Sequence, residues 1–391
     1  MKEIKCDVLV VGGGVSGSSA ARSAAMNGAK TIIIEKNSDT VKPACAEAIS
    51  DYLLPLLPFQ LPRAQLKWNI IGLKFYADGL SISRKGNFWK GFGIERSKIN
   101  PWITHQAMKA GAKLSTKTEL VNLECNEDCS ITGAIVKKNE KEIRIKPKVV
   151  IAADGAKSIV AKSMNVLGEK KCSFAYITSF EMSHIKIKNP HLEQIFFDDF
   201  AQKGFAFIFP KSSRRANIGV GSVLFKDDTE KFFDKFMNFD LVEKQLKGGK
   251  TIIDRSGFAP VDYSLKTNVF GNVIFTGDAA NQNIKPFIEG VLPGIICGDI
   301  AGVCTSNFLK NKAKLTDYNK IIENKLGEIL SSSNQILNLM VRIFEQKNRT
   351  DYLLLLALCS NIFDITTIES LFNMSYGELR EQIEKLITCK N

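Results

Sequence analysis

The sequence predicts a mixed α/β (α+β) protein in which an antiparallel β-sheet domain is inserted into a parallel α/β domain and helices follow at the C-terminus. Three observations lead to this prediction. Residues 6–11 are apolar except for Asp7, typical of a buried parallel strand, and an Ala-rich helix and a second strand follow at once. Strand-like segments rich in aromatic residues dominate residues 172–223. From residue 315 onward the apolar residues recur at helical spacing.

The composition is that of an ordinary globular protein. The chain has 391 residues, 45% hydrophobic and 24% charged, which is enough for two domains and an appendage. Its net charge of +12 is spread along the sequence, so we expect no nucleic-acid partner, whereas peripheral contact with an anionic membrane fits a basic surface. The nine cysteines are irregularly spaced, which favours a cytoplasmic protein with free thiols and no metal site.

The order of the segments predicts the domain organisation. Strands are also expected at residues 70–76 and 80–83, a helix at 96–110, an antiparallel meander at 113–123, 131–137 and 142–151, a strand at 270–276 and a helix at 290–308. The predicted division assigns residues 1–75, 95–170 and 265–310 to the parallel α/β domain, residues 76–94 and 171–264 to the β-rich substrate domain, and residues 311–391 to a helical region.

A glycine motif follows the first strand. Gly12, Gly14 and Gly17 stand at the spacing G-x-G-x-x-G between a strand and a helix, and Glu35 ends the next strand. The glycines allow a tight turn, an approach of the backbone to a pyrophosphate, and close helix packing, while the helix N-terminus attracts phosphate. An acid at the second strand end binds ribose hydroxyls and disfavours a 2′-phosphate. The motif therefore predicts a Rossmann-type site for a dinucleotide other than NADP.

Three further motifs follow along the chain. Asp278 comes in the sequence GDAA, directly after an apolar strand, where an acid either binds a ligand or caps a turn or helix. Asp154 lies in ADG, with Ser158 shortly after it. Arg96 lies in ERSKIN at the start of a predicted helix.

Together these motifs resemble FAD-binding proteins of the glutathione-reductase and para-hydroxybenzoate-hydroxylase kind, and among them the geranylgeranyl reductase family. Two further segments carry the closer resemblance. Residues 42–50, KPACAEAIS, are similar to the family's P-x-x-C-G-E-G-L-S. Residues 204–211, GFAFIFPK, with ANIGVG at 216–221, are similar to its G-Y-x-W-x-F-P-K and A-N-V-G-x-G. The resemblance covers most of the chain.

The chain departs from the family pattern at several positions near the cofactor. Ala46 and Ala48 stand where the family has glycines, Phe207 replaces a tryptophan, and Asn100 replaces an acid. The family's P-x-x-G-x-G-I is one residue shorter here, at residues 286–291. These departures affect the expected substrate more than the expected cofactor.

The resemblance implies a function and its residues. It implies FAD as cofactor, with Asp278 on the ribityl chain, and an FAD-dependent reductase that saturates carbon–carbon double bonds of geranylgeranyl or other isoprenoid lipid chains in archaeal-type membrane lipid biosynthesis. The electron donor is expected to be a ferredoxin-like carrier, reduced flavin or NAD(P)H. The cofactor-binding residues implied are Gly12, Gly14, Ser16, Gly17, Glu35, Ala46, Ala48, Arg96, Leu120, Asp278, Gly290 and Val291, and the catalytic residue is Cys45.

Several alternatives stay open from the sequence. Phe205, Phe207 and Phe209 alternate on one strand face, which is either sheet core or the wall of a site for the isoprenoid substrate. Cys45 is either a thiol beside the flavin or a small buried apolar residue. The C-terminal helices either cap the fold or contact a membrane. An aromatic hydroxylase, a quinone-linked oxidoreductase or a non-catalytic protein that binds flavin or lipid would use the same fold.

Overall fold

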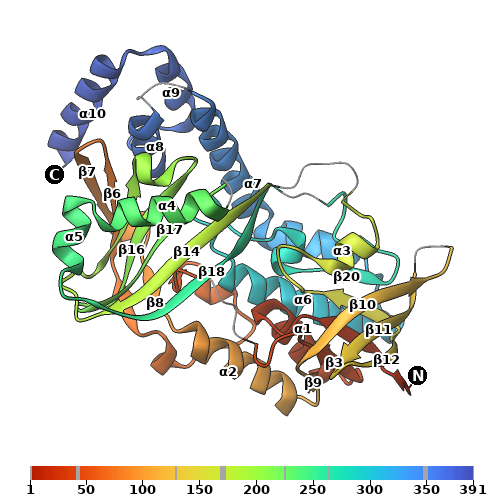
Figure 1. Ribbon diagram of the computed structural model, residues 1–391. Helices are drawn as coiled ribbons and strands as arrows, with labels where there is room; N and C mark the ends of the chain where they lie inside the picture. Colours follow the sequence, from red (N-terminus) through yellow and green to blue (C-terminus); the bar gives the residue numbers. More distant parts are fainter. Residues whose placement is uncertain are drawn as a thin grey trace.

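A computed structural model describes residues 2–40, 45–127, 130–167, 173–223, 226–262, 265–346 and 351–390. Figure 1 shows a smaller α/β part near the N-terminus, a large twisted sheet beside it, and a lobe of helices that carries the C-terminus. Two large sheets therefore organise the molecule, as the predicted fold class requires.

A six-stranded sheet forms the α/β part, in the order β19-β20-β13-β2-β3-β9. The pairs from β20 to β9 are parallel and β19 is antiparallel. Strands β2 and β13 are completely buried, as their unbroken apolar sequences predict. The strands are β2 (Val8–Val11), β3 (Thr31–Ile34), β9 (Lys113–Ser115), β13 (Val149–Ala152), β19 (Val269–Phe270) and β20 (Val273–Phe275).

Helix α1 (Val15–Met26) packs closely along helix α6 (Val291–Leu309). A Cβ added at Gly298 would stand 2.2 Å from the carbonyl oxygen of Ser16, so glycine lets the two backbones approach. Helix α6 is long and apolar enough to cross a membrane, but 78% of its apolar window is buried inside the molecule. Helix α6 is therefore a core helix. Helix α2 (Arg96–Lys109) also packs against α1.

The meander expected within residues 113–151 is wrong in detail, because it divides between two sheets. Lys117 has a left-handed φ of 50° and separates β9 from the next strand, and Pro147 stands between β12 and β13. The strand expected at 270–276 is likewise broken, at Gly271 with φ 54°. The three strands between β9 and β13 join the N-terminal strand in a separate four-stranded sheet. Its strands are, in order, β1 (Lys2–Lys5), β12 (Lys141–Lys146), β11 (Ile131–Lys138) and β10 (Thr118–Cys125).

The larger sheet has seven strands in the order β18-β14-β17-β16-β15-β6-β7. Strand β6 begins at Gly72, so it lies wholly in this sheet, although the predicted division places residues up to 75 in the other domain. A small sheet of β4 (Ala48–Ser50), β8 (Gly91–Gly93) and β5 (Trp68–Ile70) adjoins it. The seven strands are β6 (Gly72–Ala77), β7 (Leu80–Lys85), β14 (Ser173–Ser183), β15 (Leu192–Phe197), β16 (Gly204–Ser212), β17 (Arg215–Ser222) and β18 (Lys250–Asp262).

Helices cover both faces of the larger sheet. Two helices that the sequence did not predict, α4 (Lys226–Met237) and α5 (Asp240–Leu246), pack on one face around Ile208 and Ile218. The C-terminal helices pack on the other face around Phe75 and Phe207. They are α7 (Asp317–Glu345), α8 (Asp351–Cys359), α9 (Ile365–Ser370) and α10 (Tyr376–Lys390), and the short α3 (Ile159–Ser163) lies in the α/β part.

Candidate active site

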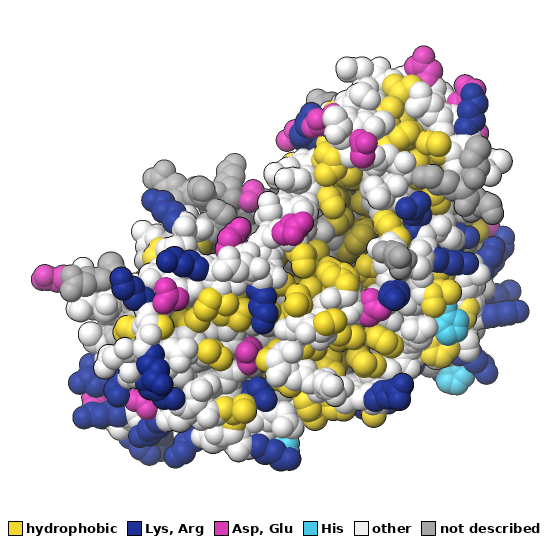
Figure 2. All heavy atoms as spheres, turned by 180° about the vertical axis from the view of Figure 1, so that it is seen from behind, with side chains coloured by type: hydrophobic (Ala, Val, Ile, Leu, Met, Phe, Trp, Pro, Cys, Tyr) yellow, Lys and Arg dark blue, Asp and Glu magenta, His cyan; other side chains and the backbone are white. Residues whose placement is uncertain are grey.

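One large cavity, of about 1510 Å³, joins the α/β part to the inner face of the seven-stranded sheet. Its walls come from the ends of the first parallel strands, from strands of the larger sheet and from helices α7 and α8. Figure 2 shows hydrophobic side chains gathered in and around a hollow below the lobe of C-terminal helices. The cavity has a polar end and an apolar end.

The polar end lies where strand β2 meets helix α1. Gly12 has φ of 100°, and a Cβ there would stand 2.4 Å from the carbonyl oxygen of Ala153, so glycine is required. Around Gly14, no described heavy atom lies within 4 Å of the Cβ position, which leaves room for a phosphate at the helix N-terminus. Glu35 accepts a hydrogen bond from the Gly13 N–H at 2.8 Å and lines the same end. This cradle fits a dinucleotide.

Asp278 reaches the cavity from the short helix η5 (Gly277–Ala280). Ser16 joins this segment to the first motif, because its hydroxyl hydrogen bonds to that of Thr276 at 3.1 Å. A Cβ at Gly290 would stand 3.1 Å from the Asp278 carboxylate. Helix α6 begins at the next residue, Val291, so its N-terminus faces the cavity and carries a partial positive charge there.

Two of the other motifs hold local structure. The Asp154 carboxylate accepts hydrogen bonds from Ser158 Oγ at 2.7 Å and from the Val160 N–H at 3.1 Å, and so fixes the start of α3. Burial raises the pKa of Asp154. Arg96 Nε donates to Asn100 Oδ1 at 2.8 Å, so the asparagine that replaces the family's acid still holds the guanidinium.

The segment from Cys45 to Ala48 forms one wall between the two ends. Its left-handed residue is Glu47, with φ 62°, and not either of the alanines that replace family glycines. Cys45 Sγ accepts from the Glu47 N–H at 3.3 Å and from Arg96 at 3.5 Å. Cys45 also packs against the hydrophobic core, so the choice between a thiol beside the flavin and a small buried apolar residue stays a prediction.

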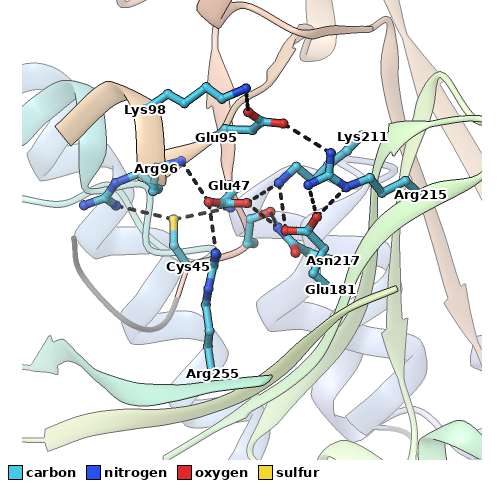
Figure 3. A network of polar contacts seen from close by, with 11 residues as sticks. Cys45, Glu47, Glu95, Arg96, Lys98, Glu181, Lys211, Arg215, Asn217 and Arg255 are labelled. Atoms are coloured by element: carbon cyan, nitrogen blue, oxygen red, sulfur yellow. Dashed lines mark hydrogen bonds and ion pairs between the residues drawn. The ribbon is translucent and has the colours of Figure 1, made fainter. Parts of the chain in front are cut away.

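A buried network of ion pairs and hydrogen bonds holds residues 45–48 in place (Figure 3). Lys211 bridges the carboxylates of Glu47 and Glu181, and Arg255 lies 3.0 Å from Glu47. Asn217 Nδ2 donates to the Ala46 carbonyl at 2.8 Å. Burial by itself raises the pKa of Glu47, but Lys211 and Arg255 outweigh it and the net pKa is lowered. Glu47 is therefore a charged anchor for the cavity wall.

The apolar end lies against the inner face of the seven-stranded sheet. Phe205, Phe207 and Phe209 all line it, and their neighbouring rings lie 6.3 and 4.9 Å apart. A Cβ at Gly219 would stand 2.4 Å from the Phe207 ring, so this glycine makes room for the ring. The roof comes from the C-terminal helices and adjoining loops, through Ile336, Leu337, Met340, Phe344, Leu358 and Phe363.

Three ionisable side chains in the cavity wall escaped the sequence reasoning. Lys285 is buried beside Asp278, and burial lowers its pKa to about 8. Burial raises the pKa of Glu289 to about 7, and burial together with the Glu289 charge raises that of Glu193 far above its usual value. A signal existed in the sequence, because Glu193 shares a strand face with the apolar Ile195 and Phe197.

Most of the predicted site residues meet in this cavity. Two do not line it: Gly17 packs on strand β2, and Leu120 lies in the core with Val136. Lys42, Pro43 and Ala44 of the family-like segment lie outside the described residues. Those that line it are Gly12, Gly14, Ser16, Glu35, Cys45, Ala46, Ala48, Arg96, Phe205, Phe207, Phe209, Asp278, Gly290 and Val291.

Comparison with known proteins agrees with this geometry. The family model described as FAD binding domain matches residues 71–283, and that described as FAD dependent oxidoreductase matches residues 7–39. In solved structures, a geranylgeranyl bacteriochlorophyll reductase-like protein of Thermoplasma acidophilum has the same fold, with TM-score 0.75 and 24% identity over 98% of this chain and 100% of that one. A flavin-dependent brominase variant matches with TM-score 0.69 and 16% identity over 97% and 99%.

Curated relatives identify the branch. The digeranylgeranylglycerophospholipid reductase of Methanocaldococcus jannaschii is 33% identical over 340 residues, which cover 83% of this chain and 84% of the relative. The enzyme of the same name from Methanococcus aeolicus is 31% identical over 329 residues, or 82% of each chain. The chain is an FAD-dependent oxidoreductase, and it belongs to the family of the digeranylgeranylglycerophospholipid reductases.

Proposed function

We propose that this protein uses FAD to saturate carbon–carbon double bonds in the geranylgeranyl chains of an archaeal-type glycerophospholipid. The observation that carries the proposal is the single cavity, in which a dinucleotide cradle opens directly onto a wall of phenylalanines. The names of the curated relatives give the same substrate class. An apolar site of this size suits a long hydrocarbon chain better than a small polar substrate.

The two ends divide the work of binding. We infer that Gly12, Gly14 and Glu35 hold the adenosine and pyrophosphate part of FAD, while Asp278 and the N-terminus of α6 hold the flavin part. When reduced, FAD supplies a hydride to one alkene carbon. The aromatic wall positions the isoprenoid chain and excludes water from the reacting carbons. Cys45 lines the cavity and is the candidate catalytic thiol of the proposal.

Electron supply and membrane contact are further parts of the proposal. We expect electrons from a ferredoxin-like carrier, reduced flavin or NAD(P)H, and peripheral contact of a cytoplasmic protein with its lipid substrate's membrane. The C-terminal helices bury apolar residues against the larger sheet, which supports their role as a cap. Flotation with anionic liposomes at low and high salt tests membrane contact, and no binding at low salt would overturn it.

Lipid analysis tests the main proposal. The purified holoprotein is reduced by dithionite under anaerobic conditions and mixed with a digeranylgeranyl glycerophospholipid. The mass of the lipid product is then measured by mass spectrometry. We expect a gain of two hydrogens for each double bond reduced. In heavy water both should be deuterium, because dithionite supplies only electrons and both added hydrogens come from solvent. Oxygen incorporation in the presence of NAD(P)H would instead indicate a hydroxylase. Bound FAD with no lipid product under any donor would indicate a protein that binds without turnover.

A further inference from the structure

Two carboxyl groups, of the buried Glu193 and the partly buried Glu289, lie in the wall of the cavity, outside the ionic network. Glu193 comes from strand β15, in the middle of the larger sheet, and Glu289 from the segment just before helix α6. Both side chains line the cavity, although its apolar end offers little compensation for a charge. A buried acid in a cleft, without a cation, is a candidate for a chemical role.

The sheet register places Glu193 at the apolar end. It lies opposite Leu73 on β6 and two residues before Ile195, which lies opposite Phe207 on β16. Side chains two residues apart share a face, so Glu193 points into the cavity with the phenylalanine wall. The residue is 2% exposed, and among the described residues no group hydrogen bonds to its Oε1.

The second carboxyl group, that of Glu289, lies near the polar end of the cavity. Its Oε1 accepts from the Ser50 N–H at 3.0 Å and from Ser50 Oγ at 2.8 Å, so this group is held in position. The next residue is Gly290, which approaches Asp278. The charge of Glu289 acts on Glu193 across the cavity, and it raises the pKa of Glu193 further. The charge of Glu289 therefore adds to burial in favouring the protonated form of Glu193.

We propose that Glu193 is the general acid of the reaction. The assignment deepens the proposed function and rests on it. The bond that holds the hydride in the reduced cofactor would break, and the hydride with its electron pair would form a C–H bond at one alkene carbon. The O–H bond of Glu193 breaks, and its proton forms the C–H bond at the other carbon. The alkene is reduced by two electrons and the cofactor is oxidised by two. Glu193 is left as a carboxylate and regains a proton from solvent before the next turnover.

The other ionisable groups of the cavity fit this role less well. Lys285 Nζ is already committed to Asn281 and to the Asn283 carbonyl. Cys45 lies at the ionic network, with its sulfur accepting two hydrogen bonds. A carboxylic acid in an apolar wall keeps its proton near neutral pH and can release it to a neighbouring carbon, where positive charge develops as the alkene is protonated.

The test uses three isosteric variants of the holoprotein: Glu193→Gln, Glu289→Gln and, as matched control, Asp198→Asn. Asp198 directly follows β15, the strand of Glu193, and burial raises its pKa as well. It does not line the cavity. The first readout is the infrared C=O band of a protonated carboxyl at neutral pH, without substrate. We expect Glu193→Gln to lose a band that Asp198→Asn keeps. If Glu193→Gln leaves all such bands unchanged, Glu193 is not a stored acid.

The second readout is single turnover of the dithionite-reduced protein with the lipid, across pH. General acids contribute on the order of 10²–10⁴-fold. We expect a loss of at least about a hundredfold in Glu193→Gln, a shifted pH profile in Glu289→Gln, and no loss in Asp198→Asn. Bound FAD should be unchanged. Equal rates in wild type and Glu193→Gln overturn the assignment.

Two controls separate the causes of failure. If Glu193→Gln loses FAD or unfolds, Glu193→Asp is tested in its place, because it keeps an acid at the same position. An infrared band and a turnover rate within about tenfold of wild type support the role of Glu193. A loss of turnover as large as that expected for Glu193→Gln overturns it. A wild-type protein that reduces no geranylgeranyl lipid overturns the proposed function itself. Normal wild-type turnover with an equally active Glu193→Gln overturns only the acid.

Discussion

The wall of the cavity contains two kinds of buried glutamate. Glu47 has no exposed side-chain surface and is surrounded by Lys211, Arg255 and Asn217, so it stays charged. Glu193 is also buried and has only another acid, Glu289, acting on it. The same side chain is therefore an anchor in one place and a stored proton in the other, and the difference lies in which strands bring cations to it.

The two kinds of glutamate give stability opposite dependence on pH. The pKa of Glu47 is lower in the folded protein than in the unfolded chain, so its contribution is present above the unfolded pKa and is lost as pH falls. The pKa of Glu289 is raised to about 7, so its contribution is present below the unfolded pKa and is lost as pH rises through 7. Each prediction below tests one side of this contrast.

The largest effect is expected from Lys211→Met, which removes the cation shared by two buried carboxylates. Breaking a buried pair typically costs about 3–5 kcal/mol, and chemical denaturation should show a loss of that size in the free energy of unfolding. Lys98→Met is the matched control, because Lys98 is largely exposed and pairs only with Glu95. A loss no greater than that of the control would show that the network does not anchor the wall.

The loss of unfolding free energy that the wild-type protein shows as pH rises should be smaller in Glu289→Gln. The pKa rises from 4.5 to about 7, which corresponds to roughly 3 kcal/mol lost between about pH 4.5 and 7. The glutamine can still accept from Ser50. Urea unfolding at pH 5 and pH 8 should therefore show a smaller pH dependence in the variant. The same dependence in both proteins would mean that Glu289 is not a neutral buried acid.

Glu35→Gln tests a third buried carboxylate, which backbone N–H groups satisfy instead of cations. Loss of charge-assisted hydrogen bonds to the ribose should weaken FAD binding by roughly 1.5–3 kcal/mol. Titration of the apoprotein with FAD, followed by flavin fluorescence, measures this change. Glu119→Gln, at an exposed position on β10, should bind FAD as the wild type does. Equal affinities in both variants would remove Glu35 from the cofactor site.

The smallest effect is expected from Arg215→Gln. Arg215 also pairs with Glu181, but its side chain is 37% exposed and Lys211 remains in place. Solvent screening should limit the change in unfolding free energy to within about 1 kcal/mol. Thermal melts of Arg215→Gln beside Lys211→Met therefore rank the exposed and buried cations of one network. A reversed order would contradict the assignment of Lys211 as the central cation.

The sequence predicted the local structure around Gly12, Gly14 and Glu35 because local rules govern a strand–turn–helix unit, and these residues line the cavity. Strand alternation likewise places Phe205, Phe207 and Phe209 on one face, which also lines the cavity. That these residues bind cofactor and substrate stays a prediction. The fold class and the FAD cofactor were confirmed.

The sequence failed where partners come from distant segments. Nothing local tells that Lys211 meets Glu47, which lies 164 residues away, or that no described residue forms an ion pair with Glu193. The meander was wrong because a single left-handed residue, Lys117, sends neighbouring strands to different sheets. The departures at Ala46 and Ala48 proved compatible with the fold, since the unusual backbone angle falls on Glu47, which the network holds.

The roof of the cavity has an evolutionary consequence. Its apolar residues come from helices α7 and α8, which lie beyond residue 283, where the matched FAD-binding family model ends. Substitutions in these helices therefore alter the shape of the apolar end without touching the cofactor cradle. The terminal segment can thus vary independently of the part of the chain that matches the FAD-binding family, so the shape of one end and the binding at the other are separately mutable.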